Sequence, residues 1–285
     1  MSNSPKQHCL DINGTRLNLY EWEGDGPPLL FVHANGLHAR CWDQVIKYLP
    51  EFHCFAIELR SHGLSDITLP PFDWRIYIED IIQLFHTLDL EQMVGVGHSF
   101  GGFLLALAAA RHDLFKKLIL IDPLMPSPEF ARFYENWQGE HPCRNRQHLW
   151  PSSEAFLEKL KDRPPFKDWD PKVLCDYTLH GLKKNTESDN YVLACPPEVE
   201  GALFEELEMS SIYTYVKRIK SPVVLVRGRE KASNDFSMDF SMSTTWPGSV
   251  DHFQDCKDIY LPQQSHFIPM EIPEKVADII RDSVV

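Results

Sequence analysis

The sequence predicts an α/β fold in which a mostly parallel sheet carries helices on both faces. Three observations predict it: strand and helix signals alternate up to residue 122, the alternation then stops, and strands with a final helix resume after residue 215. Alternation of this kind builds parallel sheets because each crossover helix returns the chain to the same edge. We therefore predict a sheet domain, residues 1–122 and 216–285, interrupted by a helical cap at residues 123–215.

The N-terminal part contains a hairpin followed by alternating elements. Asn13-Gly14 favours a type I′ turn between two apolar runs. Short apolar runs indicate buried strands, and apolar residues at helical spacing indicate helices. Asp73 can cap one of these helices. The predicted elements are strands at Cys9–Ile12, Leu17–Trp22, Leu29–His33, Phe52–Leu59, Met93–Val96 and Leu118–Ile121, and helices around Trp42–Leu49, Asp73–Phe85 and Phe100–Arg111.

The segment from Pro123 to about Tyr215 is irregular and holds 10 of the 21 prolines. Strands resume at Val223–Val226 and Ile259–Leu261, and a last helix begins at Pro273, a residue favoured in the first helical turn. An insertion at this point lies where open α/β sheets bind ligands.

The composition excludes several classes of protein. The 28 basic and 41 acidic side chains among 285 residues give a net charge of −13, which disfavours a nucleic-acid partner. The 43% hydrophobic content disfavours wholesale disorder. The longest apolar run, Phe103–Ala110, is too short for a membrane span. We predict a small-molecule substrate, while the oligomeric state is left open.

The cysteines and histidines suggest neither disulfides nor a metal site. The seven cysteines are odd in number and scattered, without a CxxC pair, as in a cytoplasmic protein with reduced thiols. The N-terminus lacks a signal-peptide pattern. HExxH is absent, and His252 with Cys256 makes only two ligands. We predict no metal and no cofactor.

A nucleophile is predicted at Ser99, within Gly97-His98-Ser99-Phe100-Gly101. This G-x-S-x-G pattern stands between a strand and a helix, where a sharp turn strains the serine backbone and exposes its hydroxyl. Glycine at 97 and 101 avoids clashes in that turn. A dinucleotide-binding loop is the competing interpretation, but the third glycine of G-x-G-x-x-G would fall on Phe100.

A general base and oxyanion donors are predicted at the same sheet edge. His266 follows the last predicted strand, so it can converge on Ser99. The loop His33-Ala34-Asn35-Gly36 follows another strand at that edge. The backbone N–H groups of Asn35 and Phe100 are therefore candidate donors to an oxyanion.

The ordered motifs resemble those of the α/β-hydrolase superfamily over essentially the whole chain. The oxyanion loop, the stretch Glu58–Ser65, the elbow around Ser99 and the loop Ser265-His266-Phe267 are each similar to a family motif. The resemblance implies an eight-stranded core with a cap, and hydrolysis through a covalent Ser99 intermediate.

The acidic residue that orients the histidine departs from the family pattern, because Lys231 occupies the position where the family usually has Asp. A lysine cannot orient the imidazole or stabilise its cation. The favoured substitute is Asp122, at the end of the preceding strand, where Pro123 favours an extended backbone. Glu230 and Asp235 are the alternative acids, and a site without an acid is the remaining alternative.

The leading hypothesis is a carboxylesterase-like or lipase-like serine hydrolase acting on an uncharged, fairly apolar ester. Hydrolysis of a C–C bond by the same residues is a second hypothesis, and a non-catalytic ligand-binding protein a third. Aromatic residues of the cap either line a substrate pocket or form the cap's own core. They are Phe130, Phe133, Tyr134, Trp137, Trp150, Phe156, Phe166 and Trp169.

Overall fold

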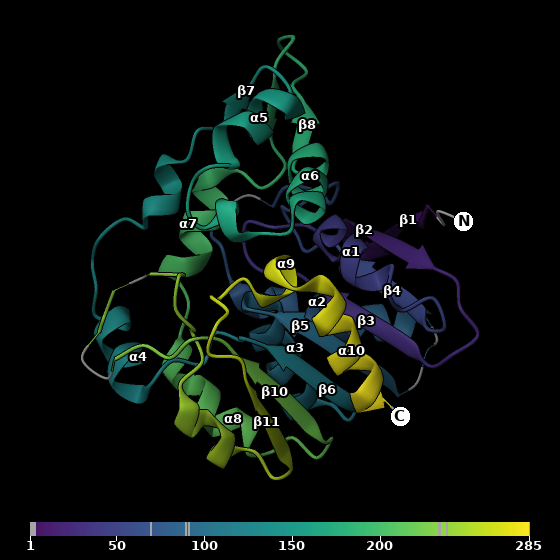
Figure 1. The fold of residues 1–285 in the computed structure, drawn as a ribbon, viewed down its shortest axis with the longest axis vertical. Helices are drawn as coiled ribbons and strands as arrows, with labels where there is room; N and C mark the ends of the chain where they lie inside the picture. Colours follow the sequence, from purple (N-terminus) through teal and green to yellow (C-terminus); the bar gives the residue numbers. More distant parts are fainter. Residues whose placement is uncertain are drawn as a thin grey trace.

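The computed structural model describes residues 4–68, 70–88, 90, 92–232, 235–237 and 239–284. An eight-stranded sheet has the order β1-β2-β4-β3-β5-β6-β10-β11 (Figure 1). The hairpin β1–β2 and the pair β2–β4 are antiparallel, and the strands from β4 to β11 pair in parallel. The predicted mostly parallel, eight-stranded α/β sheet is therefore confirmed.

The strands of this sheet are β1 (Lys6–Ile12), β2 (Thr15–Trp22), β3 (Pro28–Val32), β4 (His53–Ile57), β5 (Met93–His98), β6 (Phe115–Ile121), β10 (Val223–Arg227) and β11 (Cys256–Tyr260). The β1–β2 turn has φ values of 50° at Asn13 and 72° at Gly14, as a type I′ turn requires.

The helices are α1 (Asp43–Ile46), α2 (Trp74–Leu88), α3 (Phe100–Arg111), α4 (Pro128–Glu135), α5 (Ser153–Leu160), α6 (Pro171–His180), α7 (Pro197–Glu205), α8 (Ile212–Val216), α9 (Ile268–Glu271) and α10 (Pro273–Val284). The apolar pattern predicted as one helix at Trp42–Leu49 divides into the 3₁₀ helix η1 (Ala39–Trp42) and the single turn α1.

Alternate residues of the strands face two separate apolar layers. Leu30 and Val32 of β3 pack in the layer that contains α2, α3 and α8. Leu29 and Phe31 pack in the layer that contains α1 and α10, which lie in front of the sheet in Figure 1. All residues of β5 are buried, as expected of a central strand covered on both faces. This rigid strand leads directly to Ser99.

The inserted segment is not wholly helical. It contains α5 and α6 together with a three-stranded antiparallel sheet, β7 (Leu149–Trp150), β9 (Tyr191–Leu193) and β8 (Leu182–Lys184). These elements stand above the main sheet in Figure 1, whereas α4 contacts the 3₁₀ helix η4 (Met209–Ser211) near α8. Strands this short show no alternation that a sequence pattern could reveal. The division at residues 122 and 216 stays a prediction.

Two further features bear on the predictions from composition. All seven cysteines are unpaired. No helix within the described ranges combines the length and apolar character that crossing a bilayer requires.

Candidate active site

Ser99 is the single residue between β5 and α3. Its φ of 53° and ψ of −118° are strained for a residue with a side chain. A Cβ atom at Gly97 would lie 2.7 Å from the backbone of Gly102, and one at Gly101 would lie 2.3 Å from the carbonyl oxygen of Val32. The turn therefore closes only with glycine on both sides of the serine.

His266 lies in the loop between β11 and α9, at the carboxyl edge where β5 also ends. Its Nε2 atom is 2.9 Å from the Oγ atom of Ser99. Both residues are almost completely buried. The hydroxyl can donate its proton to Nε2, which is the contact that a general base requires.

Asp122 follows β6 and completes a line of three polar groups. Its Oδ2 atom is 2.6 Å from the Nδ1 atom of His266. The fully buried carboxylate also accepts hydrogen bonds from the backbone N–H groups of Gly228 at 3.2 Å and Thr244 at 2.9 Å, and from the hydroxyl of Ser243. These donors fix the orientation of the buried carboxylate.

The backbone of Asp122 differs from the prediction. Its φ is 43°, so the expected extended conformation before Pro123 is wrong. The N–H group of Asp122 bonds to the carbonyl of Val226 at 2.7 Å, and Thr244 and Gly228 fix the side chain. Aspartate tolerates positive φ better than most residues, and these contacts outweigh the local preference.

The two alternative acids have other partners. The Glu230 carboxylate accepts from the guanidinium of Arg227 at 3.0 Å. The Asp235 carboxylate accepts from the backbone N–H group of Ser237 at 2.8 Å. Neither has a hydrogen bond to His266 in the described part of the chain.

Of the predicted oxyanion donors, Phe100 follows Ser99 in the chain, and Asn35 lines the same cavity. Phe100 is the first residue of α3, so its N–H group has no acceptor within the helix. Asn35 lies in the loop after β3 and lines the same cavity as Ser99. Its side-chain amide donates to the carbonyl of Glu200 at 2.9 Å, and the next N–H group, of Gly36, donates to the Nε2 atom of His62 at 3.1 Å.

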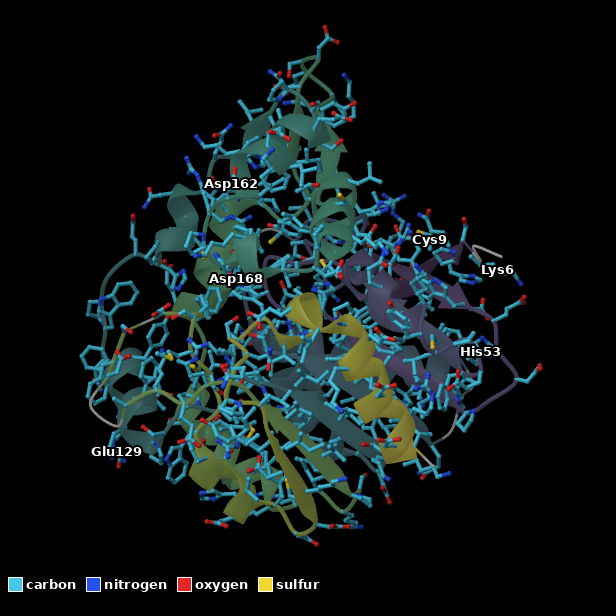
Figure 2. All side chains as sticks on the ribbon, viewed as in Figure 1. Lys6, Cys9, His53, Glu129, Asp162 and Asp168 are labelled. Atoms are coloured by element: carbon cyan, nitrogen blue, oxygen red, sulfur yellow. The ribbon has the colours of Figure 1, made fainter. Side chains whose placement is uncertain are left out.

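A cavity of about 430 Å³ opens over Ser99 between the sheet edge and the cap. Phe166, Trp169 and Tyr177 line it from the cap, and Phe240 from the loop between β10 and β11. Asp168 lies at the same junction of cap and core (Figure 2). Aromatic side chains thus form one part of the lining, and polar groups that include four charged side chains form another.

Some of the cap aromatics take one of the two roles left open by the sequence. Four others take neither, because two pack in the main core and two are exposed: Phe130 and Tyr134, and Phe133 and Trp137. Trp150 and Phe156 are buried in the cap's own core and do not line the cavity, whereas Phe166 lines the cavity and also packs against that core. Trp169 does both, because it packs in that core and lines the cavity.

Several contacts of this site were not predicted from the sequence. Ser243 and Thr244 bind the Asp122 carboxylate, and the Ser-Thr-Thr run at 243–245 is the only local signal for them. Arg146 and Glu200, also in the cavity, form an ion pair across segments far apart in sequence. Among the described residues, no three His, Cys, Asp or Glu side chains form a metal-binding group.

Comparison with known proteins gives one relative that matches almost the whole chain and others that match part of it. Esterase Rv0045c of Mycobacterium tuberculosis is 24% identical over 287 residues, covering 98% of this chain and 90% of that protein. The (E)-2-((N-methylformamido)methylene)succinate hydrolase of Acinetobacter baylyi is 26% identical over 125 residues, 43% of this chain. That match spans only 48% of the relative.

The fold has solved counterparts as well. The crystal structure of an E-2-(acetamidomethylene)succinate hydrolase superposes with a TM-score of 0.80 at 22% identity, covering 99% of both chains. A family profile described as the alpha/beta hydrolase family matches residues 29–279. The chain belongs to the alpha/beta hydrolase family.

Proposed function

We propose that this protein is a serine hydrolase that cleaves an uncharged, fairly apolar carboxylic ester through an acyl intermediate on Ser99. The observation that carries the proposal is the continuous contact from Ser99 Oγ to His266 Nε2 at 2.9 Å and from His266 Nδ1 to Asp122 at 2.6 Å. A base that touches the hydroxyl and an acid that touches the base are the two requirements for activating serine.

In the first half of the reaction, His266 takes the Ser99 proton as Oγ bonds to the ester carbonyl carbon. The carbonyl oxygen becomes an oxyanion, which the N–H groups of Asn35 and Phe100 stabilise. The bond to the alcohol oxygen then breaks, and the alkoxide takes the proton from His266. Asp122 accepts the hydrogen bond from Nδ1 throughout and stabilises the imidazolium.

In the second half, water attacks the acyl carbon and gives its proton to His266. The second tetrahedral intermediate breaks at the bond to Ser99, which regains its proton, and the carboxylic acid leaves. The likeness to an esterase across 98% of the chain and the aromatic side chains in the cavity support an ester with an apolar substituent.

A fluorophosphonate probe tests the proposal, because it reacts with an activated serine regardless of the natural substrate. We expect the wild type to be labelled and Ser99→Ala to remain unlabelled. A series of p-nitrophenyl esters of increasing acyl length then measures the preference of the cavity. A folded wild type that neither takes the label nor hydrolyses any ester of the series would overturn the proposal.

A further inference from the structure

A buried ion pair lies inside the cavity but outside the proposed catalytic groups. The guanidinium of Arg146, just after the 3₁₀ helix η2 (Pro142–Asn145), donates to the carboxylate of Glu200 in α7. It also donates to the hydroxyl of Tyr177 in α6 at 2.7 Å. The side chains of Arg146 and Glu200 are 26% and 7% exposed, and all three residues line the cavity over Ser99.

Glu200 rests directly against the oxyanion loop. Its backbone carbonyl accepts from the side-chain amide of Asn35 at 2.9 Å. A Cβ atom at Gly36 would lie only 2.5 Å from the Oε1 atom of Glu200. A substrate held with its carbonyl at this loop therefore has its neighbouring atoms close to the ion pair.

The charges around the cavity do not favour an anion. Arg146 is the only lysine or arginine among the described residues that line it, and Glu200 neutralises its charge. Two further carboxylates, Asp168 and Asp239, line the cavity on exposed positions. A substrate carboxylate would lose water on entry without meeting an uncompensated positive charge, which is unfavourable.

We propose that Glu200 is a specificity-determining residue that neutralises Arg146 and so excludes esters carrying a carboxylate near the scissile bond. The inference rests on the proposed ester hydrolysis at the same site. It reconciles the proposed neutral substrate with a partly buried arginine whose partner, Glu200, contacts the oxyanion loop. Releasing that arginine by removing the charge of Glu200 opens the site to anions.

Glu200→Gln is the sharpest variant because it keeps the shape that packs on Gly36. The glutamine oxygen can still accept from Arg146, so the guanidinium keeps a partner but carries an unbalanced charge. Charge-assisted bonds to a planar carboxylate then become available. Glu198→Gln is the matched control, since Glu198 is exposed on the same helix and lies outside this cavity.

The experiment compares kcat/KM for two matched ester pairs, methyl 4-acetoxybenzoate against 4-acetoxybenzoate and dimethyl adipate against monomethyl adipate. In the wild type, we expect the neutral member of each pair to be preferred at least about tenfold. Glu200→Gln should reduce this preference at least about tenfold, whereas Glu198→Gln should leave it in place. Adding Arg146→Met to Glu200→Gln should restore the preference.

Binding measured without catalysis separates this inference from the proposed function. Calorimetric titration of monomethyl adipate into Ser99→Ala, with and without Glu200→Gln, should give tighter binding in the double variant. Equal wild-type activity on neutral and charged esters would overturn the inference. So would an unchanged preference in a Glu200→Gln enzyme that still hydrolyses the neutral esters. If Glu200→Gln lacks a cooperative thermal transition, the wild-type preference alone decides.

Discussion

The Nε2 atom of His98 lies 2.9 Å from the backbone carbonyl oxygen of His266. A carbonyl only accepts, so the proton of this buried imidazole is on Nε2. Burial lowers the pKa of His98 to about 3, which keeps the ring neutral at any ordinary assay pH. The residue before the proposed nucleophile therefore anchors the loop that carries the proposed base.

Loss of this anchor should slow turnover more than it weakens binding. We expect His98→Phe, which keeps a ring but removes the donor, to lower kcat about tenfold with a smaller change in KM, because the geometry between His266 and Ser99 loosens. Steady-state kinetics on a neutral ester measure this. His112→Phe, at an exposed position after α3, is the control. An unchanged kcat in folded His98→Phe would contradict the anchoring role.

The acid should be identifiable by comparing three isosteric variants. We expect Asp122→Asn to lower kcat by up to about 10⁴, because the amide cannot stabilise the imidazolium and favours the wrong tautomer. Glu230→Gln and Asp235→Asn should have far smaller effects, since their carboxylates bind Arg227 and Ser237 instead. Fluorophosphonate labelling of Asp122→Asn should continue at a reduced rate. Greater loss in Glu230→Gln than in Asp122→Asn would refute the assignment.

The core fold follows from patterns that are local in sequence. Alternating apolar runs and helical periodicities predict β5 and α3 closely, and the glycines around Ser99 mark the turn between them. The Asn13-Gly14 turn is predicted for the same reason, since two adjacent residues carry its whole signal.

Contacts between distant segments could not be predicted in this way. The position of Asp122 against His266 depends on the loop that contributes Ser243 and Thr244, which has no periodic pattern. The pairing of Arg146 with Glu200 likewise depends on how the cap folds over the sheet. The sequence at Lys231 could exclude the usual acid, but only three-dimensional packing selects among the carboxylates that remain.

A further prediction concerns His62, which accepts a hydrogen bond from the oxyanion loop. Its Nδ1 atom lies 2.7 Å from the carbonyl of Arg60, so the proton is there and Nε2 is free to accept from Gly36. Burial lowers the pKa of His62 to about 4, which preserves this arrangement above that pH. His62→Ala leaves the Gly36 N–H group without its acceptor next to Asn35.

We expect His62→Ala to lower kcat roughly 10- to 100-fold, because an oxyanion donor works only when it is held in place. The exposed His112→Ala serves as the comparison. Stopped-flow measurement of the acylation step would localise the defect. A variant that acylates at the wild-type rate would show that the loop holds its shape without His62.

The last prediction concerns Glu58, whose protonation makes the stability of the protein depend on pH. Its carboxylate is buried and accepts from the side-chain amide of Asn18 at 3.0 Å and from the backbone N–H group of Leu64. Burial raises the pKa of Glu58 from 4.5 to about 7. Between these values the folded protein keeps a proton that the unfolded chain has released, so this residue's contribution to stability falls as the pH rises.

Glu58→Gln should remove that dependence, because the amide is neutral at every pH and still offers an acceptor. A pKa shift of this size lowers the free energy of unfolding of the wild type by roughly 3 kcal/mol at neutral pH and above. Thermal unfolding at intervals from about pH 5 to pH 8 should show that the stability of the variant increases relative to that of the wild type as the pH rises. Buried histidines with lowered pKa values act in the opposite direction, but they are common to both proteins and cancel in the difference. Glu79→Gln, at an exposed position in α2, provides the reference. Parallel curves for Glu58→Gln and the wild type over this range would show that the Glu58 proton is not coupled to folding.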